Sequence, residues 1–252
     1  MSRSAFWLFL SLLTCATAIT VAATPQDDFA AGNELYESKE FGQAIQKYES
    51  ILSQGLQSAP LYYNLGNAYF KSGDLGRAIL NYHRAARLDP GNSDIAENLS
   101  FASGFTSVQM EGVKLNPVRT FLQMLVAPYH LDSLAWLSSA LFVLLIALLA
   151  VRFGVGMRSA WLKGTVVSTL TLFVISSFFT TYKYRHEYLT ERAVILAEDC
   201  QVRTGPSEQS DIELRGAPGL VVEVLAESGD YYSVLFENKR RGWVQKNLVD
   251  II

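Results

Sequence analysis

Four asparagines recur at a fixed interval in the amino-terminal half of the chain. Asn33 and Asn67 lie 34 residues apart, and Asn64 and Asn98 are separated by the same interval. An amide side chain offers both a hydrogen-bond donor and an acceptor, which suits it to hold the backbone of an extended peptide. The alternative is structural, with the asparagines bridging neighbouring helices.

Residues that could perform catalysis are not grouped. His83, His130 and His186 lie far apart, and no cysteine or carboxylate accompanies them at metal-ligand spacing. The sequence has no phosphate-binding glycine loop and no serine elbow. Cys15 falls in the first apolar segment, so a mature chain would keep only Cys200, expected as a buried strand residue. We therefore expect a non-enzymatic protein with no catalytic residue, no metal and no cofactor.

The segments that carry the asparagines repeat with the same offset of 34 residues. Further matching pairs are Gly32/Gly66, Gly42/Gly76, Ala44/Ala78, Ile45/Ile79 and Tyr48/Tyr82. This period is typical of a helix-turn-helix repeat. The second copy resembles the tetratricopeptide repeat at Tyr62, Leu65, Gly66, Tyr69, Gly73, Ala78, Tyr82, Ala85 and Pro90. The resemblance implies an all-α tetratricopeptide solenoid over residues 24–104, ending in a capping helix at 94–101.

First helices of such repeats line a concave groove, where the resemblance implies binding of a protein or peptide ligand. The predicted groove residues are Phe29, Asn33, Tyr36, Tyr63, Asn64, Asn67, Phe70 and Asn98. In family members that grip a carboxylate, lysines accompany the asparagines. Here Phe29 and Asp94 occupy two of those places.

Three apolar segments predict export and membrane anchoring. Residues 1–23 are typical of a signal peptide, with Arg3 before an apolar run and small residues at its end. Residues 131–151 and 164–182 form two long apolar runs, which predict a transmembrane hairpin over 131–182. Residues 105–130 are expected to form an interfacial linker or elbow. The predicted seam of the hairpin is a stripe of small residues, Ala135, Ser139, Val143 and Ala147.

Charge is distributed unevenly along the chain. Residues 24–117 and 189–252 each hold 7 Lys/Arg against 11 Asp/Glu, whereas residues 118–188 hold 6 against 2. Acidic flanks argue against nucleic acid as a partner. The basic loop of the hairpin favours the cytoplasmic side, and an exported residue 24 puts both flanks in the periplasm. The expected location is the bacterial inner membrane, with two spans and both soluble modules periplasmic.

The last part of the chain, residues 190–252, changes to short β-rich runs. Strands are predicted at 193–196, 221–225, 231–236 and 242–244. The segments Val202–Ser207 and Arg241–Val244 resemble the bacterial SH3 domain, which implies a small all-β SH3-like barrel. Its candidate surface aromatics are Tyr231, Tyr232 and Trp243. Trp243 could equally be a core residue.

The order of signal peptide, repeats, hairpin and SH3 domain resembles the BatE component of the Bacteroides aerotolerance operon. That family implies a scaffold or adaptor in an envelope-stress or aerotolerance complex. Its implied partners are von Willebrand A-domain membrane proteins and a MoxR-type ATPase system. The alternative function is a cell-wall sensor whose SH3 barrel binds peptidoglycan.

Overall fold

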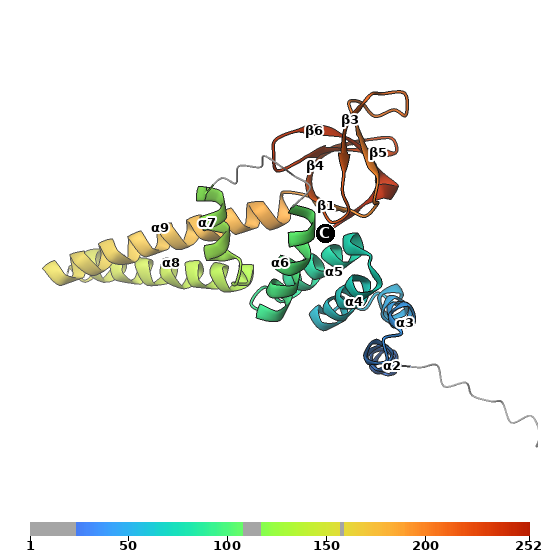
Figure 1. The fold of residues 1–252 in the computed structure, drawn as a ribbon. Helices are drawn as coiled ribbons and strands as arrows, with labels where there is room; N and C mark the ends of the chain where they lie inside the picture. Colours follow the sequence, from blue (N-terminus) through green and yellow to red (C-terminus); the bar gives the residue numbers. More distant parts are fainter. Residues whose placement is uncertain (1–23, 108–116, 157–158) are drawn as a thin grey trace, which may run out of the picture.

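The computed structural model describes residues 24–107, 117–156 and 159–252. The predicted signal peptide at 1–23 lies outside the described residues. Five helices form the amino-terminal array, in which each helix packs on the next along the chain (Figure 1). They are α2 (Pro25–Glu37), α3 (Phe41–Ser53), α4 (Ala59–Ser72), α5 (Leu75–Leu88) and α6 (Ser93–Ser107). The last helix runs six residues beyond the predicted capping helix.

Helix starts in the array are encoded by capping side chains. The Thr24 hydroxyl accepts from the Asp27 backbone N–H at 3.2 Å, and the Asp27 carboxylate accepts in return from the Thr24 backbone N–H at 3.0 Å. Ser58 caps α4, and Asp74 caps α5 by accepting from the Arg77 N–H at 2.9 Å. Each cap satisfies a backbone donor that has no partner inside the helix.

Glycine at two repeat positions lets the paired helices approach closely. A Cβ on Gly32 would lie 2.5 Å from the ring of Tyr48, and one on Gly66 would lie 2.8 Å from the ring of Tyr82. Both tyrosines are buried. The 34-residue repetition is therefore structural as well as sequential, with the same contact made in each copy.

The hairpin consists of α8 (Leu131–Gly154) and α9 (Ala160–Tyr188) packed side by side (Figure 1). Both helices are longer than predicted. The predicted small-residue seam is wrong: Val143 is exposed, and Ser138 and Leu145 are the buried residues of α8. The Ser138 hydroxyl lies 2.7 Å from the Ser176 hydroxyl, so a polar contact holds this face together.

A short helix, α7 (Pro117–Val126), joins the array to the hairpin. Its carboxyl end is held by Lys183 of α9, a lysine that is only 2% exposed. The Lys183 ammonium donates to the Val126 carbonyl at 3.2 Å and pairs with Glu187 at 2.6 Å. A cation at a helix carboxyl end is favourable, because unpaired carbonyls gather there. This contact fixes α7 against the base of the hairpin.

The carboxyl-terminal module is one curved antiparallel sheet of seven strands, in the order β3-β2-β6-β5-β4-β1-β7. They are β1 (Arg192–Ile195), β2 (Cys200–Arg203), β3 (Ile212–Gly216), β4 (Val221–Ser228), β5 (Tyr231–Leu235), β6 (Arg241–Gln245) and β7 (Val249–Ile251). Strands β3 and β7 were not predicted, and of β2 only Cys200 was expected as a buried strand residue. Val222, Val234 and Val244 lie in the core, as their alternation predicts.

The barrel docks on the outer face of α5 (Figure 1). Gly76 lies directly against β1 and its continuation: a Cβ there would stand 2.8 Å from the Leu196 Cα and 2.9 Å from the Ile195 carbonyl. Val194 of β1 belongs to the buried core of the array. Apolar packing therefore continues from the repeats into the barrel.

Two arginines of α5 complete the contact at the carboxyl-terminal strand. Arg84 donates to the Ile251 carbonyl at 2.8 Å and pairs with Asp250 at 3.1 Å. Arg87 donates to the Ile252 carbonyl at 3.0 Å. We call the docked array and barrel, α2–α6 with β1–β7, the soluble head.

Candidate functional site

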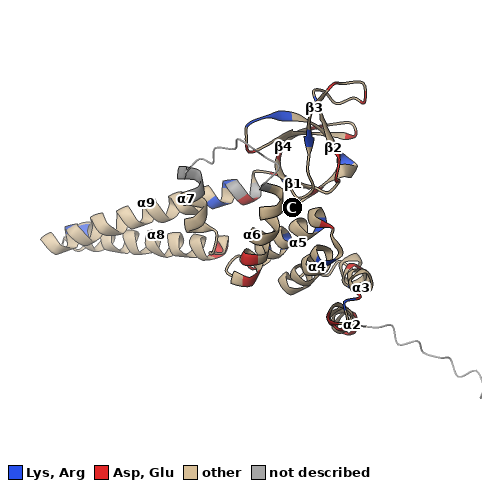
Figure 2. Cartoon of the chain, viewed as in Figure 1, with Lys and Arg blue, Asp and Glu red and all other residues tan. Residues whose placement is uncertain are grey.

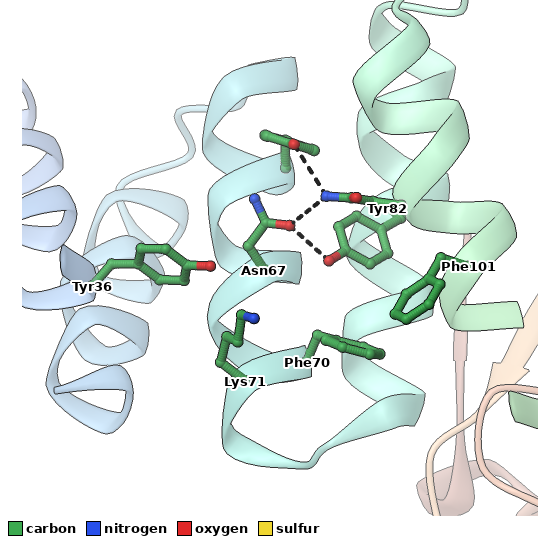
Figure 3. A pocket seen from close by; sticks show the side chains of 8 residues that line it. Tyr36, Asn67, Phe70, Lys71, Tyr82 and Phe101 are labelled. Atoms are coloured by element: carbon green, nitrogen blue, oxygen red, sulfur yellow. Dashed lines mark hydrogen bonds between the residues drawn. The ribbon is translucent and has the colours of Figure 1, made fainter. Parts of the chain in front are cut away.

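The four repeated asparagines form two equivalent hydrogen-bonded sets. In the first set, the Asn33 amide oxygen accepts from the Tyr48 hydroxyl at 2.7 Å and from the Asn64 amide at 2.9 Å. In the second set, the Asn67 amide oxygen accepts from the Tyr82 hydroxyl at 2.7 Å and from the Asn98 amide at 2.9 Å (Figure 3). The asparagines thus bridge neighbouring helices, as the structural alternative supposed.

Asn33 and Asn67, the central asparagines of the two sets, bridge neighbouring helices through the amide oxygen alone. Both acceptor positions of the Asn67 oxygen are occupied, while its Nδ2 group donates to no residue that the structure describes. In Figure 3 this nitrogen points away from the bonded side chains. The same holds for the Nδ2 group of Asn33. Each amide is therefore fixed in orientation, and its N–H donors are unpaired among the described residues.

A cavity of about 290 Å³ opens beside the second set. Its lining residues come from α2, α4, α5 and α6: Tyr36, Tyr63, Asn67, Phe70, Lys71, Tyr82, Asn98 and Phe101. Its volume lies just below the range of small-molecule pockets, about 300–1,000 Å³, and suits a few side chains of a peptide. We call this cavity and its rim the groove.

The groove brings together five of the eight residues predicted for it: Tyr36, Tyr63, Asn67, Phe70 and Asn98. Phe29, Asn33 and Asn64 do not line it. The Phe29 ring lies 5.9 Å from the Tyr48 ring, in the packing of the first repeat. Sequence reasoning missed Lys71, Tyr82 and Phe101. Helical spacing could have found two of them, because Lys71 follows Asn67 by four residues and Phe101 follows Asn98 by three.

The buried tyrosines behind the asparagines remain protonated at ordinary pH. Burial raises the pKa of the Tyr48 hydroxyl to about 12, and burial also raises the pKa of Tyr82. A neutral phenol keeps its proton to donate, so each asparagine oxygen stays occupied. On the groove wall, burial and the neighbouring Glu37 raise the pKa of Tyr36.

Three phenylalanines form an apolar shelf at one end of the groove. Phe70 lies 5.7 Å from Phe101 and 5.8 Å from Phe105, and the last two rings meet edge-to-face at 5.3 Å. Although they pack on each other, Phe101 is 62% exposed and Phe105 is 52% exposed. Clustered rings with this exposure are typical of a surface that contacts another molecule.

Two of the three candidate aromatics of the barrel, Tyr231 and Trp243, lie on one face of the sheet, and Tyr232 lies on the other. Tyr231 is 7% exposed, and its hydroxyl accepts from Gln245 at 3.3 Å. Tyr232 pairs with Val244 and Trp243 pairs with Ser233, so Tyr232 and Trp243 lie on opposite faces of the sheet. Tyr232 packs against the core. Trp243 lies on the outer face of the sheet and is half-buried, so its side chain is more accessible to solvent than that of the buried Tyr231.

Metal-ligating side chains do not gather in the part of the chain that the structure describes, where no group of three or more His, Cys, Asp or Glu is placed to hold a metal ion. Cys200 is buried in the barrel core. Burial, with a smaller contribution from Asp199, raises the pKa of its thiol to about 12. This thiol therefore stays protonated and unreactive at neutral pH.

Two parts of the chain match known protein families. Residues 59–92 match the tetratricopeptide repeat, which covers α4, α5 and the turn that follows. Residues 197–250 match the bacterial SH3 domain, which covers β2 to β7 up to its second residue. No curated protein matches the chain. The chain therefore contains a tetratricopeptide repeat and a bacterial SH3 domain, two types of module that are typically non-catalytic and bind proteins or peptidoglycan.

Proposed function

We propose that the chain is a non-enzymatic adaptor, anchored in the bacterial inner membrane, that binds a partner protein through the groove. The observation that carries the proposal is the fixed Asn67 amide, whose oxygen is consumed inside the protein and whose N–H donors remain for a ligand. The carbonyl groups of an extended peptide are the natural acceptors for such donors. Because the amide is held in place beforehand, little conformational entropy is lost on binding.

The hairpin supports membrane anchoring. The helices α8 and α9 are long and apolar enough to cross a membrane, and most of their surface is open to the surroundings. At 24 residues, α8 is about 36 Å long, which exceeds a hydrocarbon core of about 30 Å. Arg152 lies in the last turn of α8 and Lys163 in the first turn of α9, where the hairpin turns, and Figure 2 shows Lys or Arg near this end of the hairpin. Positive charge there favours a cytoplasmic turn.

The docked soluble head supports the same topology. The array precedes the hairpin and the barrel follows it, yet the two modules pack on each other through α5 and β1. Two crossings return the chain to the side from which it started, so the contact requires no further span. With the signal peptide expected at residues 1–23, that side is the periplasm.

A place in an envelope-stress complex is the finer part of the proposal. The order of repeats, hairpin and SH3 domain supports the resemblance to the BatE component of the aerotolerance operon. Partners of this kind would be von Willebrand A-domain membrane proteins working with a MoxR-type ATPase.

The test replaces the hydrogen-bond donors of the Asn67 side chain by an acceptor of nearly the same shape. Asn67→Asp keeps an oxygen for Tyr82 and Asn98 but replaces the free N–H donors with a carboxylate oxygen. The control is Asn247→Asp on the exposed surface of the barrel, which makes the same change of charge. Tagged full-length chains are purified from native membranes after mild crosslinking. We expect the partner to be lost with Asn67→Asp and retained with Asn247→Asp; retention by both would refute groove binding.

The second candidate function is a cell-wall sensor, favoured by the match of residues 197–250 to the bacterial SH3 domain. Its test is sedimentation of the full chain, in detergent, with purified peptidoglycan sacculi. If the sensor function is correct, the wild type pellets with sacculi, Trp243→Ala stays in solution and Asn67→Asp still pellets. If wild type and Trp243→Ala both stay in solution, the sensor function is wrong.

A further inference from the structure

We infer that the groove selects an extended segment of a partner protein in which an aromatic side chain lies next to a carboxylate. This inference rests on the proposed function, because it names the ligand of the same groove. It is carried by two neighbouring features: the phenylalanine shelf, formed by Phe70 of α4 with Phe101 and Phe105 of α6, and Lys71, which follows Phe70 on α4.

The shelf supplies the aromatic part of the selection. Phe70 forms its floor and Phe101 its rim, and both line the cavity (Figure 3). An aromatic side chain from a ligand can add a further edge-to-face or offset contact to the rings already packed there. It would also remove from water the Phe101 surface that the protein leaves exposed.

Lys71 supplies the charged part. It is the one ionised side chain among the residues that line the cavity, and no acidic residue lines it. Lys71 is exposed and forms no ion pair with any residue that the structure describes. Glu37 influences Tyr36 from the exposed end of α2 but is not part of the lining. The cavity wall is thus positive and rich in donors, which favours a carboxylate.

The arrangement fixes the order of the two groups in space. Lys71 follows Phe70 directly on α4, so the ammonium and the ring leave the helix about 100° apart and flank the same opening (Figure 3). A ligand with the ring and the carboxylate on adjacent residues can reach both. The carboxylate could belong to an Asp or Glu side chain or to the end of a chain, and the chemistry on the groove side is the same.

The experiment selects peptides on the full chain in lipid nanodiscs. A displayed library of random dodecapeptides is enriched on the wild type and, in parallel, on Asn67→Asp. Selected peptides are synthesised with a free and with an amidated carboxyl end, and their affinities are measured by fluorescence anisotropy. The variants are Phe101→Ala and Lys71→Met, with the exposed residues Leu56 and Lys239 changed to Ala and Met as matched controls.

We expect peptides with an aromatic residue beside an acid, bound about two- to tenfold more weakly by Phe101→Ala and about two- to fivefold more weakly by Lys71→Met. The Lys71 effect should fade at high salt. Loss of affinity on amidation assigns the carboxylate to the chain end, and no loss assigns it to a side chain.

Enriched peptides that depend on Asn67 but lack the aromatic–acid pair would overturn this inference and leave the proposed function standing. Peptides that bind Asn67→Asp as well as the wild type would overturn both. Equal losses in the Leu56 and Lys239 controls would also overturn the inference, because the effects would then not belong to the groove.

Discussion

Replacing Gly76 by alanine tests whether the barrel docks on the array. Gly76 and Gly42 are equivalent positions 34 residues apart, and each is the second residue of its helix, α5 or α3. Their surroundings differ completely. A Cβ on Gly42 would meet nothing within 4 Å, whereas one on Gly76 would lie 2.8–3.0 Å from backbone atoms of Ile195 and Leu196.

The two substitutions should therefore change stability in opposite directions. Alanine is favoured over glycine within a helix by roughly 0.5–1 kcal/mol, so Gly42→Ala should stabilise the array by up to that amount. At Gly76 the same gain is offset by overlap with backbone atoms, which cannot turn aside as a flexible side chain could. Carbon contacts prefer about 3.5–4.0 Å, and forcing an additional methyl group into a packed site costs roughly 1–3 kcal/mol. The difference in unfolding free energy between Gly42→Ala and Gly76→Ala therefore measures the cost of this overlap.

The assay is urea unfolding of the full chain in mild detergent, monitored by the circular dichroism signal of its helices. We expect the midpoint to rise for Gly42→Ala and to fall for Gly76→Ala. Equal stabilisation by both alanines would mean that α5 faces water at this position. The docking of the barrel on the array would then be refuted.

Three further predictions concern the same structure. Tyr82→Phe removes the hydroxyl that holds Asn67 and should lower the unfolding free energy by roughly 0.5–1.5 kcal/mol in the same urea assay; a change near zero would show that this bond does not orient the amide. Burial, and to a lesser extent Arg192, lowers the pKa of His83 to about 3, against about 6.5 in an unfolded chain. Because the unfolded state then binds the extra proton, the contribution of His83 to stability should be constant above about pH 6.5 and decline as the pH falls towards 3, and His83→Gln should flatten the decline of the unfolding free energy measured across pH; an unchanged slope would contradict the lowered pKa of His83. Alkaline phosphatase fused after Ile252 should be active in intact cells, and a well-expressed but inactive fusion would exclude the periplasmic topology.

The helical array could be predicted in some detail because its constraints are local. The 34-residue offset and the paired glycines relate helices that are joined by short turns, and the match of residues 59–92 confirms the repeat type. From the sequence, peptide binding and helix bridging were the two alternative roles of the asparagines. In the structure the Asn67 oxygen bridges neighbouring helices, while its amide nitrogen donates to no described residue.

Contacts between distant segments could not be predicted in this way. Gly76 marks the docked face of α5, but in sequence it is one repeat position among several, and nothing local distinguishes it from Gly42. Strands β2 and β3 are short and are joined by a polar loop, so alternation gave little signal, although burial of Cys200 and Val202 defines their inner side. The seam of the hairpin was misplaced because the stripe through Ala135, Ser139, Val143 and Ala147 was chosen on the first span, whereas the Ser138–Ser176 contact selects another face of α8.

Photocrosslinking from the groove tests the central claim most directly. A photoreactive phenylalanine analogue replaces Phe101 at the rim of the groove or, as a control, the exposed Leu56 away from it, in the full chain in living cells. If the groove binds a partner protein, illumination yields a discrete crosslinked protein from position 101 that is missing from position 56 and is lost when Asn67→Asp is added. If position 101 captures only lipid, or the same proteins as position 56, the groove is not a partner-binding site and the account fails.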